Sequence, residues 1–186
     1  MSEQLTNPEL LNPVEADSYV IAACQVLSQP ASQHEGIGVT ELYKDESRST
    51  LSFARLTLET DDGVTYEVGM TDDTSGKSLL VSRKSTDIEG DLLHTSVTRS
   101  GDVNSRRNRF RLTETVPGQD KLEISNDQQK AKDALATIGG DFKMSLQQKL
   151  SDRPELIDMI AWTQEDVTAK QRRSRLGKLA GRVAFK

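Results

Sequence analysis

The sequence is poor in the residue types on which many functional classes depend. Its 186 residues include one cysteine and two histidines, and only 4% of them are aromatic. The single Cys24 excludes an internal disulfide, and no paired-cysteine or His-Glu-x-x-His motif indicates a zinc site. No apolar run approaches the about 18 residues that a membrane-spanning helix needs. These absences count against disulfide-stabilised, zinc-dependent and helical membrane proteins.

The first residues have the wrong charge for a targeting peptide. Residues 1–12 include Glu3 and Glu9 but no basic residue, whereas signal and organelle-targeting peptides are basic near their start. The same segment is polar and has no periodicity, so we expect it to be disordered. A reducing cytoplasm is therefore the expected location, and the lone cysteine agrees with it.

Charge is distributed unevenly along the chain. The net charge is −5, yet residues 167–186 hold seven basic residues and no acidic one. The remaining 17 basic and 29 acidic residues give the rest of the chain a charge of −12. We therefore expect a disordered segment at 1–12, a single α+β domain at 13–166 and a basic segment at 167–186.

Periodicity in the first two thirds of the chain predicts a helix followed by a sheet. Apolar residues spaced by three and four predict a helix from Pro13 to about Gln29. From Gly36 to Ser125 the period falls to two, with turn signals about every ten residues. This pattern predicts an antiparallel sheet of about seven strands, arranged as a meander or a partly closed barrel.

The clearest strand pattern runs from Val64 to Met70. Tyr66 and Val68 alternate there with polar residues, so we expect them to face the core while Thr65 and Glu67 face solvent.

The last third of the chain predicts three to four helices. Asn126 or Asp127 can cap the first, and Gly139-Gly140 is expected to end it. Further on, Thr163 with Asp166 resembles a capping box and predicts a new helix that carries the basic residues. We expect these helices to pack on one face of the sheet, which completes the predicted α+β fold.

Few residues are arranged for catalysis or metal binding. Gly76-Lys77-Ser78 lacks the upstream glycine of a phosphate-binding loop, and the pairs Asp61-Asp62 and Asp72-Asp73 lack the ligand spacing of a calcium loop. Cys24 lies on the apolar face of the first helix, where a core role is expected. We therefore predict no catalytic residue, metal ligand or cofactor. The alternative is a small-molecule enzyme with a carboxylate-based site between the sheet and the helices.

A short arginine cluster is one candidate for anion binding. On a strand, Arg107, Arg109 and Arg111 would share a face opposite Phe110 and Leu112. Such a face can hold phosphates or carboxylates because guanidinium groups bind them through two hydrogen bonds. The alternative, which we favour, is a solvated face that pairs with glutamates on the next strand.

The C-terminal segment is the better candidate. Leu176, Leu179, Ala180 and Val183 have the spacing of one helical face, so the segment is predicted to be a basic amphipathic helix. Gly177 and Gly181 each weaken it by about 1 kcal/mol, so we expect it to become ordered on contact with a partner. The predicted partner-binding residues are Lys170, Arg172, Arg173, Arg175, Lys178 and Arg182.

Four targets suit such a segment: an acidic protein surface, nucleic acid, an anionic membrane, or the acidic body of this protein itself, within one molecule or between molecules. The scarcity of aromatic residues counts against stacking on nucleic-acid bases, and the small apolar side counts against peripheral membrane contact. We interpret the protein as a non-catalytic binding or adaptor protein that engages an anionic partner, with a protein partner or self-association slightly preferred to nucleic acid.

Overall fold

A computed structural model of the chain describes most of its backbone. The described backbone covers residues 11–45, 50–73, 76–101, 107–116, 118–119 and 121–183, and side chains are described for these except 41–45, 50–52, 73 and 174–183. The predicted disorder of residues 1–12 therefore falls mainly outside the described residues. Of that segment, Leu11 and Asn12 are described: Leu11 is buried, and Asn12 caps the first helix in a capping box with Glu15.

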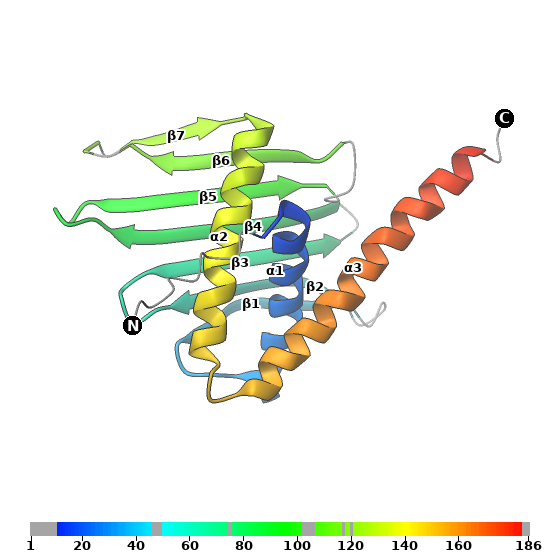
Figure 1. The fold of residues 1–186 in the computed structure, drawn as a ribbon, viewed down its shortest axis with the longest axis horizontal. Helices are drawn as coiled ribbons and strands as arrows, with labels where there is room; N and C mark the ends of the chain where they lie inside the picture. Colours follow the sequence, from blue (N-terminus) through cyan, green and yellow to red (C-terminus); the bar gives the residue numbers. More distant parts are fainter. Residues whose placement is uncertain are drawn as a thin grey trace, which may run out of the picture.

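The described strands form one seven-stranded antiparallel sheet in which each strand pairs with the next along the chain. This order, with the helices, confirms the predicted α+β class and antiparallel sheet (Figure 1). Of the two forms predicted for the sheet, the strand order is that of the meander. The strands are β1 (Ile37–Asp45), β2 (Thr50–Glu59), β3 (Thr65–Asp73), β4 (Gly76–Thr86), β5 (Leu92–Ser100), β6 (Arg109–Thr115) and β7 (Leu122–Ser125).

Alternation along the strands gives the sheet a buried inner face and a more polar outer face. Tyr66 and Val68 of β3 are 3% and 0% exposed, whereas Thr65 and Glu67 are partly exposed. The predicted register of this strand is confirmed.

Three α-helices, α1 (Pro13–Leu27), α2 (Gln128–Lys149) and α3 (Pro154–Val183), and one 3-10 turn, η1 (Pro30–Ser32), complete the described structure. Helices α1 and α2 contact the strands, and α3 packs on α1 (Figure 1). None of the helices in the described part of the chain has the length and apolar character needed to cross a membrane. Among the described residues, two α-helices follow the sheet, so the prediction of three to four was wrong.

The predicted helix breaks at Gly139-Gly140 and at Thr163 are absent for physical reasons, whereas the chain does break between α2 and α3, before Pro154. Helix α2 continues through Gly139-Gly140, and a Cβ atom at Gly139 would lie 2.6 Å from the Cβ of Ala16. The missing side chain lets α2 approach α1 closely, so this glycine serves packing. Helix α3 runs past Thr163, whose hydroxyl donates to the carbonyl of Met159 inside the helix and so does not cap a new one.

An aromatic cluster joins the helices to the sheet. The ring of Phe142 on α2 lies 6.2 Å from that of Tyr19 on α1 and 6.0 Å from that of Tyr66 on β3, measured between ring centroids. Such contacts add about 0.5–1.5 kcal/mol each beyond the burial of apolar area. The layer between the helices and this part of the sheet is therefore filled by packed side chains.

Candidate functional site

All of the predicted partner-binding residues lie on α3, which crosses the expected boundary at residue 166 without interruption. The helix has two halves of opposite charge. Residues 154–169 include four acidic residues and no basic one, which we call the acidic half, and residues 170–183 include six basic residues and no acidic one, which we call the basic half. The charge asymmetry seen in the sequence is thus displayed along a single helix.

Apolar side chains hold the acidic half against α1. Leu156, Ile160 and Val167 are buried there, at spacings of four and seven residues that place them on one side of α3. The opposite side of α3 faces away from α1. Burial of this kind contributes about 1.5–3 kcal/mol per large aliphatic side chain, so the acidic half is a firmly packed element.

Two glutamines add polar contacts to the same side of α3. The Nε2 atom of Gln164 donates to the carbonyl of Glu15 and to the hydroxyl of Ser18, each at 3.2 Å. Seven residues further on, the Nε2 atom of Gln171 donates to Oδ1 of Asp17 at 3.2 Å. Beyond this point α3 projects away from the sheet, as the red end of the helix in Figure 1 shows.

A buried ion pair lies beneath Gln171. Arg99 of β5 donates through Nε to the carboxylate of Asp17 on α1, and its guanidinium also donates to the carbonyl of Gly101. Both charged side chains are almost completely buried. Gln171 therefore ties the end of the anchored part of α3 to a charge pair that already joins α1 to the sheet.

Sequence reasoning missed this pair, although periodicity contained the signal. Arg99 has the same parity as Val97 along β5, which places it on the inner face, and Asp17 lies three residues before the buried Val20 on α1. One charge predicted on each of two buried faces would have indicated a pair, because a lone buried charge is costly.

The described basic residues of α3 are exposed. Lys170 forms an ion pair with Asp166 one turn earlier, with 2.6 Å between Nζ and Oδ2, and both side chains are mostly exposed. Arg172 and Arg173 are exposed as well. The remaining three predicted residues, Arg175, Lys178 and Arg182, lie on the helical backbone of α3, and their side chains are outside the described residues.

The arginine cluster on the sheet is smaller than predicted. Arg109 and Arg111 are exposed on the outer face of β6, while Phe110 is buried on the inner face. Arg107 lies in a turn before the strand, so it does not continue the row. The β5 residues opposite Arg109 and Arg111 are Ser100 and Thr98. The register therefore places no glutamate of β5 directly opposite Arg109 or Arg111, where the sequence predicted ion pairs with a neighbouring strand.

The two candidate anion-binding surfaces are not brought together. Arg109 and Arg111 lie on the outer face of the sheet, whereas α3 lies on the helix-covered side. A ligand that contacts one surface would have to wrap around the molecule to reach the other.

A groove of about 860 Å³ lies where α3 diverges from α1 and α2. Its lining includes two basic residues, Lys132 and Arg172, and two acidic residues, Glu15 and Glu165. Because the charges balance, the groove itself gives no preference for an anion.

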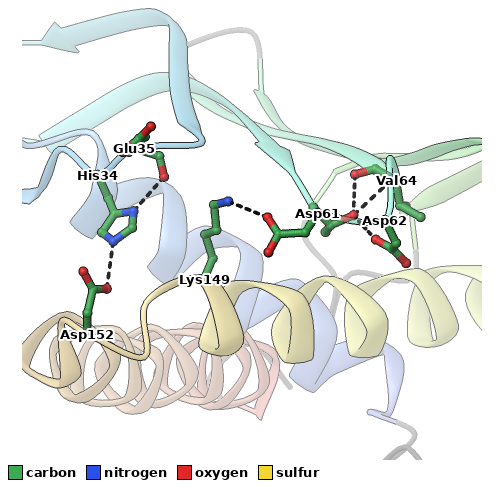
Figure 2. Close-up of polar contacts among 8 residues, drawn as sticks. His34, Glu35, Asp61, Asp62, Val64, Lys149 and Asp152 are labelled. Carbon is green, nitrogen blue, oxygen red and sulfur yellow. Dashed lines mark hydrogen bonds and ion pairs between the residues drawn. The ribbon is translucent and has the colours of Figure 1, made fainter.

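A polar cleft of about 850 Å³ lies at the opposite end of α3, near the α2–α3 turn (Figure 2). There Nε2 of His34 lies 2.9 Å from Oδ1 of Asp152, and Nδ1 lies 2.7 Å from the carbonyl of Glu35. The hydrogen bond to Asp152, and then that to Glu35, raises the pKa of His34 above its usual 6.5, because both neighbours accept hydrogen bonds from the charged ring. The hydrogen bond from His34 lowers the pKa of Asp152.

A second ion pair closes the same cleft. Nζ of Lys149 on α2 lies 3.2 Å from Oδ1 of Asp61 in the β2–β3 turn (Figure 2). The contacts of His34 and Lys149 join the ends of α2 and α3 to loops at the sheet edge. Within the described residues, no three histidine, cysteine or acidic side chains gather in a way that suits a metal ion. The contacts of His34 with Asp152 and of Lys149 with Asp61 thus act as a clamp that holds the start of α3 in place.

The other reactive groups lie in the core. Cys24 is completely buried, as predicted, and burial raises the pKa of its thiol to about 12. Among the described carboxylates, only Asp17 is buried, and Arg99 matches its charge.

Comparison of the chain with family models, curated proteins and solved structures finds no match.

Proposed function

We propose that this protein is a non-catalytic binding protein that engages an acidic protein surface through the basic half of α3. One observation carries the proposal: α3 continues as a single helix through residues 170–183, which include six basic and no acidic residues, and this end of the helix projects from the body (Figure 1). A projecting helix is accessible to a partner, and its residues contribute little to the stability of the body.

The sign pattern along α3 favours a protein partner over nucleic acid. Glu165 and Asp166 lie about two turns before Arg172 and Arg173, and all four are exposed. A nucleic acid is uniformly negative, so it would be repelled by the acidic half when it lies along the helix. A protein surface can instead place positive and negative groups to match both halves.

The alternative enzyme needs a carboxylate site between the sheet and the helices. The buried described carboxylate in that layer is Asp17, which is held by Arg99 and Gln171. No described feature there favours catalysis.

A binding assay with neutralised arginines tests the proposal. Arg172, Arg173 and Arg175 are changed together to Gln, and a control variant carries Lys77→Gln and Arg83→Gln on β4 and Lys121→Gln just before β7, all at exposed positions. Binding to a labelled poly-glutamate peptide and to a labelled single-stranded oligonucleotide is measured by fluorescence anisotropy.

The α3 variant is expected to bind the peptide on the order of tenfold more weakly, since each exposed ion pair contributes up to about 1 kcal/mol. The control variant should bind as the wild type does. Wild-type binding should weaken as salt is added, because exposed charges are screened beyond about 8 Å at physiological ionic strength. Equal loss in both variants, or tighter binding to the oligonucleotide than to the peptide, would contradict the proposal.

A further inference from the structure

The outward side of α3, opposite the side that packs on α1, has an exposed apolar centre. Trp162 is 79% exposed and Met159 is 43% exposed. Since α3 packs on α1 through its buried side, the outward side points away from α1. Large exposed aromatic side chains are common anchors of protein–protein interfaces.

Small and apolar residues repeat from Trp162 at a spacing of seven along α3, from the acidic half into the basic half. They are Ala169, Leu176 and Val183. Seven residues are close to two helical turns, so these positions form one line along the continuous helix. The small side chain of Ala169 in the middle of the line permits close approach of another helix. We call these four positions the seam.

Charged residues flank the seam in two pairs with the same seven-residue spacing. Glu165 and Arg172 lie on one flank, and Asp166 and Arg173 lie on the other. All four are exposed. In an antiparallel helix pair with two-fold symmetry, residues on the same flank of the two helices face each other.

A register centred on Ala169 matches every one of these features. It places Glu165 opposite Arg172 of a second copy, and Asp166 opposite Arg173. It also sets Trp162 opposite Leu176, so apolar positions meet along the seam. The sequence of charges on α3 is thus complementary to itself when it is read in the reverse direction.

We infer that α3 is a self-association surface on which two copies of this chain pair antiparallel, the basic half of each lying on the acidic half of the other. The inference rests on the proposed function and names the acidic protein surface as the acidic half of α3 in a second copy.

Two charge-reversal variants test this pairing, because each should disrupt the homodimer and a mixture of the two should restore it. Variant K carries Glu165→Lys and Asp166→Lys, and variant E carries Arg172→Glu and Arg173→Glu. Each homodimer would then face like charges on both flanks, whereas a mixture of the two variants would restore four attractive contacts. Mass is measured by sedimentation equilibrium on the full chain, from about 1 to about 200 µM, where micromolar affinities are resolved.

The wild type is expected to form dimers, and each variant alone should dimerise on the order of a hundredfold more weakly. The equimolar mixture should recover dimers, and thermal melts should show that both variants are folded. A wild type that stays monomeric, variants that dimerise as the wild type does, or a mixture that stays monomeric would each overturn the inference. If the wild type is monomeric but still binds poly-glutamate through Arg172 and Arg173, the inferred self-association is wrong and the proposed function still stands.

A cysteine cross-link tests the register. Ala169→Cys places the two new thiols opposite each other at the centre of the pair, within the about 7 Å that a disulfide allows between Cα atoms. Ala161→Cys is the matched control, because 16 residues would separate the two thiols along the helices, or about 24 Å. Under mild oxidation, the Ala169→Cys chain should form covalent dimers and the control should not. Equal cross-linking of both variants would contradict the antiparallel register.

Discussion

The acidic half of α3 lies on α1, whereas the basic half extends past Gln171, the last described side chain that bonds to α1. Three buried aliphatic residues and Gln164 hold the first half, and Gln171 holds the start of the second half, which carries six basic residues. Since the helix is continuous, the packing of the first half sets the direction of the second. One element thus combines a structural part and an exposed part, and substitutions in the two parts should have different consequences.

The largest effect is expected at the buried charge pair below the end of the anchored half. Arg99→Met leaves the carboxylate of Asp17 buried without its arginine, which costs about 3–5 kcal/mol of unfolding free energy. The double variant Asp17→Leu, Arg99→Met removes both charges and should recover most of that loss. Urea unfolding of both variants checks this. A double variant that is less stable than the single one would contradict the prediction that the unpaired carboxylate causes the loss.

Truncation should cost much more stability on the buried side of α3 than on its exposed side. Ile160→Ala empties a buried site against α1 and should cost about 2–5 kcal/mol. Trp162→Ala, two residues away on the exposed side, should cost less than about 0.5 kcal/mol when measured on dilute protein. Equal costs in denaturant melts would mean that Trp162 is covered and that the outward side is not a free surface.

Two glycine substitutions sharpen the contrast between packed and projecting helix. Gly139→Ala drives a methyl group into Ala16 and should cost about 1–3 kcal/mol, although alanine is the better helix former. Gly177→Ala, in the basic half of α3, should stabilise the helix by up to about 1 kcal/mol. Thermal melts that show stabilisation by Gly139→Ala would contradict the close approach of α1 and α2.

A smaller and pH-dependent effect is expected where α3 begins. The pKa of His34 is raised in the folded protein, so its contact with Asp152 stabilises the fold fully below the ordinary pKa of 6.5 and is lost as the pH rises through the raised value. The melting temperature of His34→Gln should therefore fall further below that of the wild type at about pH 5.5 than at about pH 8.5. If the difference in melting temperature between the two proteins grew towards high pH instead, the charged form of His34 would not be the stabilising one.

The sequence predicts the sheet better than the helices that cover it. Two-residue alternation at Tyr66 and Val68 reports directly which face is buried, so the register follows from local pattern. The length of α2 does not follow, because Gly139 normally ends or weakens a helix, and only the position of Ala16 on another helix explains it. Tertiary contact overrides propensity there.

The candidate site follows from the sequence only in part. Net charge locates the basic residues near the end of the chain, but it does not reveal that they share one helix with Glu165 and Asp166. The apparent capping box at Thr163 concealed this continuity. The ion pair of Asp17 and Arg99 joins residues that are far apart in the sequence, so only parity on the two elements pointed to it.

Amide hydrogen exchange along α3, measured on the full wild-type chain at several protein concentrations, tests the contrast between its halves most directly. Residues 156–171 should be protected at every concentration, because α1 holds them. Residues 174–183 should exchange faster in dilute protein and gain protection as concentration rises, and this gain should vanish when Glu165 and Asp166 are changed to Lys. Uniform protection of the whole helix that does not depend on concentration would contradict the division of α3 into an anchored half and a binding half.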